Sequence, residues 1–386
     1  MQNIYIEADA ACYEKVSGIG HTVIEMLKQF SVTADTSKFK VTAIVPYGKS
    51  NYIEDLHLDN IHIRQLPPPY KYINFLLVRT KLFIPIDLLF GRGVYIFPNY
   101  KNWSLLFSKS ITFFHDMSFK LFPETVEPKN KKYLDKNAPT WIKRADKIVA
   151  ISDNTHRDLV EFYPQYENKI ITIMLGVNHQ AYKKRSVNSV EVIKAKYSLP
   201  EKYIIYVGNI EPRKNVELLV DAYGEMFRQK HIDEHLLIVG GGGWLNEAVV
   251  AKVQKLRAEG VPIDSPSGYV SDDDLVGVIS GASLLVHPAL YEGFGLPVLQ
   301  AMATETPVLS SDSSSLSEIG GDTIEYFSVN SKEDLVKKLD QIICGKVDRQ
   351  QMTSSAFARS KQFTWEKTVT SLLFQASRMY NGKSDK

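Results

Sequence analysis

Short strand-like runs of β-branched and apolar residues alternate with amphipathic runs along this chain, and the whole alternation occurs twice. Strands that alternate with helices pair in parallel, because each connecting helix carries the chain back to the starting edge of the sheet. The order therefore predicts an α/β protein whose parallel sheets carry helices on both faces. The predicted strands are 3–8, 40–45, 61–66, 93–98, 110–116, 146–152, 169–175, 203–208, 235–241, 282–288, 306–311 and 323–327. The predicted helices are 18–30, 155–163 (capped by Asp153 or Asn154), 215–227, 246–256, 271–279 (capped by Ser271), 296–303 and 363–380.

The chain length of 386 residues exceeds what one ordinary hydrophobic core supports, and it predicts two domains. The segment KKRSVNSVE, 183–191, is polar and lacks strong apolar periodicity, and the second set of strands begins near residue 200. We therefore expect the domain boundary within about 178–200.

Several protein classes are excluded by simple features. The two cysteines, Cys12 and Cys344, are too few and too distant for a disulfide scaffold, and they argue against structural zinc. The opening MQNIYIEADA is not a secretory signal. The most apolar stretch, 73–90, contains Arg79, Lys81 and Asp87, which argues against a membrane-spanning helix. The sequence predicts a cytoplasmic protein, with peripheral contact at the inner membrane face left open.

Positive charge is concentrated in one part of the first half. Residues 71–150 contain 14 Lys and Arg against 6 Asp and Glu, although the whole chain carries a net charge of only +2. Such a basic, aromatic-rich segment suits an anionic membrane surface or an anionic acceptor, or it is simply a solvated face. A pI near 8.2 without a basic stripe gives no support to nucleic-acid binding.

Open α/β sheets bind ligands at the carboxyl ends of their strands, so the turns after strands are the candidate sites. Gly18 and Gly20 open the first helix, where free backbone N–H groups suit an anion, unless they only allow the helix to start. His115 lies at the end of the predicted strand 110–116. It suits a hydrogen bond to a sugar hydroxyl or a phosphate, or it is an ordinary polar residue whose hydrogen bonds are made within the protein. The three spaced glycines of the dinucleotide fingerprint and the P-loop are both absent from the sequence.

A basic turn follows the first strand of the second set. It runs from Gly208 to Asn215 and contains Arg213 and Lys214 side by side. A guanidinium fork next to an ammonium suits a diphosphate, whereas the alternative is a solvated turn.

The most specific pattern lies at 287–322. Glu292 follows a strand and precedes Gly293, Phe294 and Gly295, which open the helix 296–303. A carboxylate there accepts hydrogen bonds from ligand hydroxyls, and the glycines let backbone N–H groups approach the ligand closely.

These motifs carry a resemblance to a known family. The segment EGFGLPVLQAMATETPV, supported by YVGNIEPRKN, GYVSDDDL, AISDNTHRDL and FTWEKT, resembles the retaining glycosyltransferases of family 4, which are similar to glycogen synthase. Within this family the sequence most resembles bacterial polysaccharide enzymes, many of which transfer mannose or rhamnose. The resemblance implies the GT-B fold, two Rossmann-like domains facing each other across a cleft. It implies an acceptor domain at 1–180, completed by the C-terminal helix at 365–386, and a nucleotide-sugar domain at 181–364.

The resemblance also implies roles for individual residues. Glu292 matches the glutamate that contacts the transferred sugar, Lys214 matches the diphosphate lysine, and Arg213 resembles its basic partner. His115 matches a first-domain histidine near the sugar. The remaining matches are Gly18 and Gly20 (amino-terminal glycine loop), Gly268, Tyr269 and Val270 (nucleobase segment), Gly293, Phe294 and Gly295 (sugar and phosphate), and Leu296, Pro297 and Val298 (phosphate and ribose).

Two positions depart from the family pattern. Gln300 stands where the family has a second glutamate that accepts hydrogen bonds from ribose hydroxyls, and Asn209 stands where many relatives carry arginine. A neutral acceptor binds more weakly than a charged one, so Gln300 implies a weaker grip on ribose or a deoxyribose donor such as dTDP-rhamnose.

The function implied is transfer of a hexose, mannose or rhamnose favoured, with retention at the anomeric carbon. The donor would be a GDP-, UDP- or dTDP-sugar, and the acceptor a saccharide or lipid-linked glycan of a surface polysaccharide such as the O-antigen. No cofactor or metal is expected, because Arg213 and Lys214 would take the metal's part, and Asp272, Asp273 and Asp274 suit a helix start. Two alternatives stay open: a non-catalytic GT-B partner subunit with a degenerate donor site, and a nucleotide-sugar epimerase.

Overall fold

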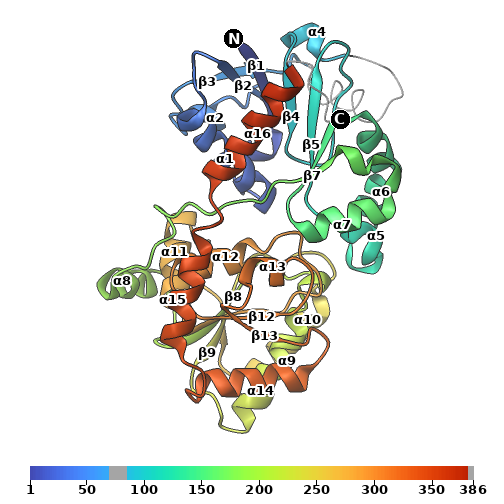
Figure 1. Ribbon diagram of the computed structural model, residues 1–386. Helices are drawn as coiled ribbons and strands as arrows, with labels where there is room; N and C mark the ends of the chain where they lie inside the picture. The colour runs from blue at the N-terminus through green and yellow to red at the C-terminus, as the bar shows by residue number, and fades with distance from the viewer. Residues whose placement is uncertain (69–84, 381–386) are drawn as a thin grey trace. The chain divides into compact units, whose positions relative to one another are not determined.

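The protein divides into two compact units. The structure, a computed structural model, describes residues 1–68 and 85–380 (Figure 1). The first unit comprises residues 1–117, 132–176 and the chain from 364 onward, and the second comprises 118–131 and 177–363. The last helix therefore belongs with the beginning of the chain, and the short segment 118–131 groups with the second unit.

The first unit is built on a seven-stranded sheet in which every pairing is parallel. Its strand order is β3-β2-β1-β4-β5-β6-β7. The interior strand β1 places Ile4 between Val41 of β2 and Val94 of β4, and all three side chains are buried. The strands are β1 (Gln2–Glu7), β2 (Phe39–Val45), β3 (Ile61–Gln65), β4 (Val94–Phe97), β5 (Lys109–Phe114), β6 (Lys147–Ala150) and β7 (Ile170–Thr172).

Helices flank this sheet, and two of them, one near each end of the chain, lie in contact. Helix α16 lies beside α1 in Figure 1, and it also contacts β1 and β4. The helices attached to this part of the chain are α1 (Gly18–Thr33), α2 (Asn51–Glu54), α4 (Asp87–Phe90), α6 (Pro128–Arg144), α7 (Asp153–Phe162) and α16 (Trp365–Tyr380).

The cap predicted for α7, Asp153 or Asn154, was wrong, because the N-cap is Ser152. Ser152 has extended backbone angles, and its Oγ accepts a hydrogen bond from Thr155 N at 3.0 Å. Asp153 already lies inside the helix and contributes its charge to the first turn. The predicted cap of α11 is confirmed, because Ser271 Oγ accepts from Asp274 N at 3.3 Å.

The second unit repeats the same topology in a six-stranded parallel sheet. Its order is β10-β9-β8-β11-β12-β13, so each sheet starts in the middle, grows to one edge and then crosses to the other side. This order confirms the prediction of two Rossmann-like α/β domains. The strands are β8 (Tyr203–Val207), β9 (His235–Val239), β10 (Ile263–Asp264), β11 (Leu284–His287), β12 (Val308–Ser311) and β13 (Glu325–Phe327).

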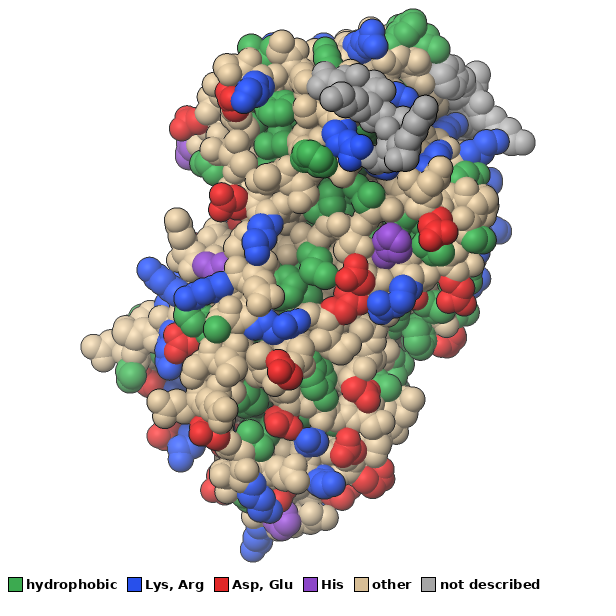
Figure 2. Space-filling view, viewed as in Figure 1, with side chains coloured by type: hydrophobic (Ala, Val, Ile, Leu, Met, Phe, Trp, Pro, Cys, Tyr) green, Lys and Arg blue, Asp and Glu red, His purple; other side chains and the backbone are tan. Residues whose placement is uncertain are grey.

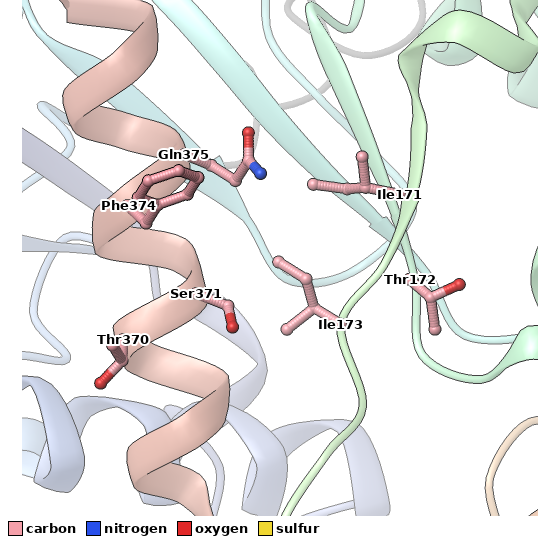
Figure 3. A pocket seen from close by; sticks show the side chains of 7 residues that line it. All are labelled: Ile171, Thr172, Ile173, Thr370, Ser371, Phe374 and Gln375. Carbon is pink, nitrogen blue, oxygen red and sulfur yellow. The ribbon is translucent and has the colours of Figure 1, made fainter.

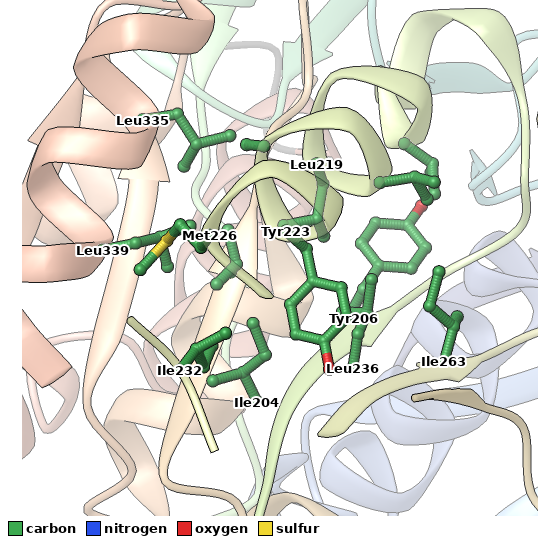
Figure 4. Close-up of a cluster of buried hydrophobic side chains, with 14 of the residues drawn as sticks. Ile204, Tyr206, Leu219, Tyr223, Met226, Ile232, Leu236, Ile263, Leu335 and Leu339 are labelled. Carbon is green, nitrogen blue, oxygen red and sulfur yellow. The ribbon is translucent and has the colours of Figure 1, made fainter. Parts of the chain in front are cut away.

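The core of the second unit packs helices α9 and α14 onto this sheet (Figure 4). Tyr223 and Met226 of α9 meet Leu335 and Leu339 of α14, and all four side chains are buried. Each such side chain contributes about 1.5–3 kcal/mol by leaving water, so the core holds the ends of the central strands in place. The helices of this unit are α5 (Ser118–Leu121), α8 (Val187–Tyr197), α9 (Val216–Arg228), α10 (Glu247–Ala258), α11 (Asp272–Ser280), α12 (Leu296–Ala303), α13 (Leu316–Gly320), α14 (Lys332–Ile343) and α15 (Arg349–Ser360).

No helix within residues 1–68 and 85–380 is long and apolar enough to cross a membrane. Most of the apolar stretch 73–90 lies outside the described residues, and its end forms the short helix α4.

Candidate functional site

The two most specific motifs lie at the switch point of the second sheet. Strands β8 and β11 are neighbours, and the chain runs from them to opposite edges, which makes their carboxyl ends the place where open α/β sheets bind ligands. Arg213 lies in the turn after β8, and its carbonyl accepts a hydrogen bond from Leu290 N at 2.9 Å. The Arg213 side chain donates to the carbonyl of Tyr291 at 2.8 Å. The turn after β8 and the turn after β11 therefore form one connected structure.

Glu292 is the centre of the connected turns. Its carboxylate is buried, and Oε1 accepts hydrogen bonds from Lys214 Nζ and from His287 Nε2, the latter at 2.8 Å. Arg213 NH1 lies 3.5 Å from Oε2. The structure thus brings together Glu292, Lys214 and Arg213 and adds His287, which the sequence analysis did not select.

The backbone of Glu292 is held as firmly as its side chain. Ser314 Oγ accepts from Glu292 N at 2.8 Å, and Ser315 Oγ donates to the Glu292 carbonyl at 2.9 Å. Gly295 turns the chain into α12 with φ of +102°, and a Cβ there would lie 2.7 Å from Leu316. Only glycine fits this turn without strain, because the left-handed region and the close neighbour both exclude a side chain.

The electrostatics keep Glu292 ionised and His287 neutral. Burial alone would raise the pKa of Glu292, but Lys214, the His287 hydrogen bond and Arg213 together hold that pKa well below its usual range. Burial lowers the pKa of His287 although Glu292 opposes the shift. A neutral His287 therefore donates from Nε2. Burial also raises the pKa of Glu211, whose Oε2 lies 4.0 Å from Arg213.

The other predicted residues of this unit lie along the same turns and on α12. Gly208 follows β8 with φ of +146°, and Phe294 is buried with its ring edge-on to Phe363. Tyr269 is 66% exposed, and Val270 beside it is buried. The positions that remain are Gly268 in the loop before α11, Gly293 next to Glu292, and Leu296, Pro297 and Val298 in the first turn of α12.

Gln300 has a protein partner in this structure. Its Nε2 donates to the hydroxyl of Tyr182 at 2.9 Å, a residue that no sequence motif pointed to. The amide nitrogen is thereby engaged, so the side-chain carbonyl is the atom suited to accept a hydrogen bond from a ligand hydroxyl.

Three predicted residues belong to the first unit. Gly18 and Gly20 open α1, and Gly20 N donates to the cap Ser17 Oγ at 3.3 Å, so that N–H is already engaged. A Cβ on Gly20 would collide with the carbonyl of Ala10. His115 is buried after β5 and donates from Nε2 to the Pro98 carbonyl at 2.6 Å, and burial lowers its pKa.

A separate groove lies in the first unit between β7 and α16 (Figure 3). It encloses about 330 Å³ and contains none of the predicted site residues. Ile171 and Ile173 approach it from the strand side, and Gln375 approaches it from the helix. On the surface shown in Figure 2, Lys and Arg side chains lie among Asp and Glu side chains, in keeping with the small net charge.

Known proteins place these turns in a family context. Residues 189–359 match the family Glycosyl transferases group 1, and this range contains Arg213, Lys214, Glu292 and Gln300. The chain carries a glycosyl transferases group 1 domain. The O-antigen chain mannosyltransferase B of Escherichia coli is 26% identical over 369 residues, which cover 92% of this chain and 94% of that protein.

Solved structures match the fold around the group 1 domain as well. A glycosyltransferase from Rickettsia africae ESF-5 superposes with a TM-score of 0.69 at 18% identity, covering 98% of both chains. The structure of Anabaena Alr3699/HepE in complex with UDP-glucose gives a TM-score of 0.69 at 13% identity, covering 98% of this chain and 100% of that one. The prediction of a glycosyltransferase with two Rossmann-like domains is confirmed.

Proposed function

We propose that this chain is a retaining, metal-independent hexosyltransferase. It would transfer the sugar of a nucleotide-diphosphate sugar, mannose favoured over rhamnose, to a saccharide or lipid-linked glycan during synthesis of a surface polysaccharide. The observation that carries the proposal is the cluster of buried Glu292 and His287 with partly exposed Lys214 and Arg213 at the switch point of the group 1 domain. It combines an ionised carboxylate, suited to sugar hydroxyls, with two cations, suited to a diphosphate.

The choice of sugar and pathway is supported by the relatives. The Escherichia coli protein that covers nearly the whole chain is an O-antigen chain mannosyltransferase. The Anabaena protein was solved with UDP-glucose, which supports a nucleotide-sugar donor. GDP, UDP and dTDP remain the nucleotides to test.

Transfer with retention requires the new bond to form on the face that the diphosphate leaves. The bond from the anomeric carbon to the diphosphate oxygen breaks, the acceptor oxygen bonds to the same carbon on the same face, and the acceptor proton passes to the departing phosphate. Arg213 and Lys214 would stabilise the negative charge that develops on the diphosphate, which is the largest contribution in many enzymes. Glu292 would hold the sugar hydroxyls, and His115 would act near the sugar from the first unit.

A non-catalytic partner subunit is the second candidate, and Gln300 favours it. The side-chain amide is neutral and already hydrogen-bonded to Tyr182, so it would bind ribose hydroxyls more weakly than a carboxylate would. Donor turnover distinguishes the two candidates, because a partner subunit with a degenerate donor site would neither hydrolyse the donor nor transfer its sugar. Gln300→Glu tests the residue itself: improved nucleotide affinity supports a weakened ribose contact, and unchanged affinity contradicts it.

Peripheral membrane contact belongs to the same proposal. It is supported by the basic segment 71–150, whose described part includes Lys129, Lys131 and Lys132 on α6, and a lipid-linked acceptor would be reached from that surface. Binding of the protein to vesicles with and without anionic lipid tests this contact. We propose a cytoplasmic location on the inner face of the membrane.

The first experiment is a thermal-shift series with GDP, UDP, ADP and dTDP in the presence of EDTA. A nucleotide at a hundred times its Kd stabilises the folded protein by about 2.7 kcal/mol, so one nucleotide should raise Tm clearly. Lys214→Ala should abolish the shift, while Lys338→Ala, which breaks an ion pair with Glu325 elsewhere in the same unit, should keep it. No shift with any nucleotide would contradict the proposal. Product analysis by NMR then decides retention, since an inverted anomeric centre would contradict it.

A further inference from the structure

His287 is a buried titratable side chain that the proposed chemistry does not yet use. It is the last residue of β11, its side chain is fully buried, and Nε2 lies 2.8 Å from Oε1 of Glu292. Its other ring nitrogen, Nδ1, has no hydrogen-bond partner among the described residues. A core histidine kept only for packing normally has both nitrogens satisfied. Here the one polar contact goes to the carboxylate at the centre of the site.

Tyr206 supports His287 from the neighbouring strand. The two rings stack at 6.3 Å with an angle of 15° between their planes. The Tyr206 hydroxyl donates to the Asn209 carbonyl at 2.9 Å, in the turn that also carries Lys214. One buried stack therefore fixes the turn after β8 through Tyr206 and the turn after β11 through His287.

Oε1 of Glu292 accepts hydrogen bonds from Lys214 and His287, and a bound diphosphate would attract these two donors to different extents. Lys214 is a flexible cation, and a diphosphate attracts it away from the carboxylate. His287 is neutral, rigid and covered by Tyr206, so a diphosphate exerts no comparable pull on it. The charged and titratable groups that face the pair are Lys214 and Arg213, with Tyr206 and Glu211 in the adjoining turn and strand.

We infer that His287 is a positioning residue for the donor sugar: its Nε2–H holds Oε1 of Glu292 while Lys214 binds the diphosphate. The inference rests on the proposed function, because it concerns the carboxylate that would receive the sugar hydroxyls. It separates two contributions to donor binding. Lys214 serves the diphosphate, and His287 serves the sugar through Glu292.

The test compares binding of GDP with binding of GDP-mannose by titration calorimetry. His287→Leu removes the donor while keeping an apolar side chain of similar size. It should leave GDP affinity within about twofold of the wild type and weaken GDP-mannose by about tenfold or more, as expected for a lost hydrogen bond to a charged group. His287→Gln, whose amide N–H can still donate, should restore part of the GDP-mannose affinity. Ser310→Ala is the matched control, because Ser310 is buried opposite His287 on β12 and bonds only within its own strand.

The pH dependence of GDP-mannose binding provides a readout that lost packing alone would not move. Losing a hydrogen-bond donor raises the pKa of a carboxylate. In His287→Leu the acid-side loss of GDP-mannose binding should therefore begin at a higher pH than in the wild type and in Ser310→Ala. An unmoved acid limb would overturn the inference.

A measurement on the wild type keeps the test independent of variant folding. With ¹⁵N-labelled histidine, NMR should find His287 neutral and protonated at Nε2 from about pH 7 to pH 8. A proton on Nδ1, or a charged ring in that range, overturns the inference. Equal weakening of GDP and GDP-mannose by His287→Leu overturns it too and leaves the proposed function intact. A wild type that binds no nucleotide overturns both.

Discussion

At the scale of single residues, Lys214 and Glu292 form a largely buried ion pair, in which Glu292 is buried and the Lys214 side chain is 16% exposed. Removing one partner leaves an uncompensated buried charge, which costs roughly 3–5 kcal/mol in typical cases. Arg213 and His287 remain beside Glu292, so Lys214→Met should lower the free energy of unfolding by an amount near the lower end, about 3 kcal/mol. The double variant Lys214→Met, Glu292→Gln should recover much of that loss. Urea unfolding measures both free energies.

The surface pair of Lys28 and Glu25 is the control. If Lys214→Met costs as little unfolding free energy as Lys28→Met, the pair of Lys214 and Glu292 is not buried as described.

Burial of His115 has a consequence for stability as a function of pH. Its pKa is lowered in the folded protein, so the unfolded chain binds the proton more readily. The contribution of His115 to the free energy of unfolding is therefore fully present above the pKa of the unfolded chain, near 6.5, and is lost as the pH falls below that value. The difference in unfolding free energy between the wild type and His115→Gln should shrink between pH 7 and pH 5, by at most about 1.4 kcal/mol per pH unit. Urea titrations at several pH values measure it, and a constant difference would contradict the prediction.

At the scale of elements, α7 shows how a helix end is decided. Ser152 lies outside the helix and accepts the Thr155 N–H, whereas Asn154 lies inside and bonds to Asp158 one turn later at 2.9 Å. Ser152→Ala should therefore cost about 1 kcal/mol of unfolding free energy. Asn154→Ala should cost only about 0.2–0.5 kcal/mol, the value of a helix side-chain pair. Chemical denaturation of the two variants distinguishes them, and the reverse order would restore the sequence-based cap.

Most elements could be predicted from the sequence because their periodicity is strong, whereas helix α8 has a weak pattern. Helix α8 lies in the segment expected to be a polar boundary, and it buries only Val190, Ile193 and Tyr197. A stripe this narrow resembles a solvated segment until the neighbouring helix is known, so tertiary packing decides α8. Helix α14 differs, because Leu335, Leu339 and Ile342 recur at helical spacing, and its sequence does contain the signal for a helix.

The candidate site divides in the same way. Glu292 and Lys214 could be selected because each follows a strand within a distinctive motif. Their contact depends on β8 and β11 being neighbours, which the strand order settles and the alternation of elements does not. His287 could not be selected, because a histidine at the end of an apolar strand reads as part of the core. Ser314 and Ser315 lay inside a serine-rich stretch that gave no reason to single out two members.

At the scale of the whole molecule, the chain ends by completing the unit in which it began. Leu372 of α16 is fully buried, and α16 contacts α1, β1 and β4. Leu372→Ala should cost about 2–5 kcal/mol, the usual range for a buried leucine. Because α16 belongs to the first unit, hydrogen exchange should accelerate in β1 and α1 more than in β8 and β9.

Phe374 provides a matched control on the same helix, since its side chain is 57% exposed and Phe374→Ala should change exchange little. The nucleotide-induced thermal shift should survive Leu372→Ala, because Lys214 and Glu292 lie in the second unit. Equal acceleration in β1 and β8 would contradict this prediction, since the two units would then unfold as one. Selective acceleration would mean that the stabilities of the first and second units can be altered separately, so that a variant with a selective defect can be traced to its own unit.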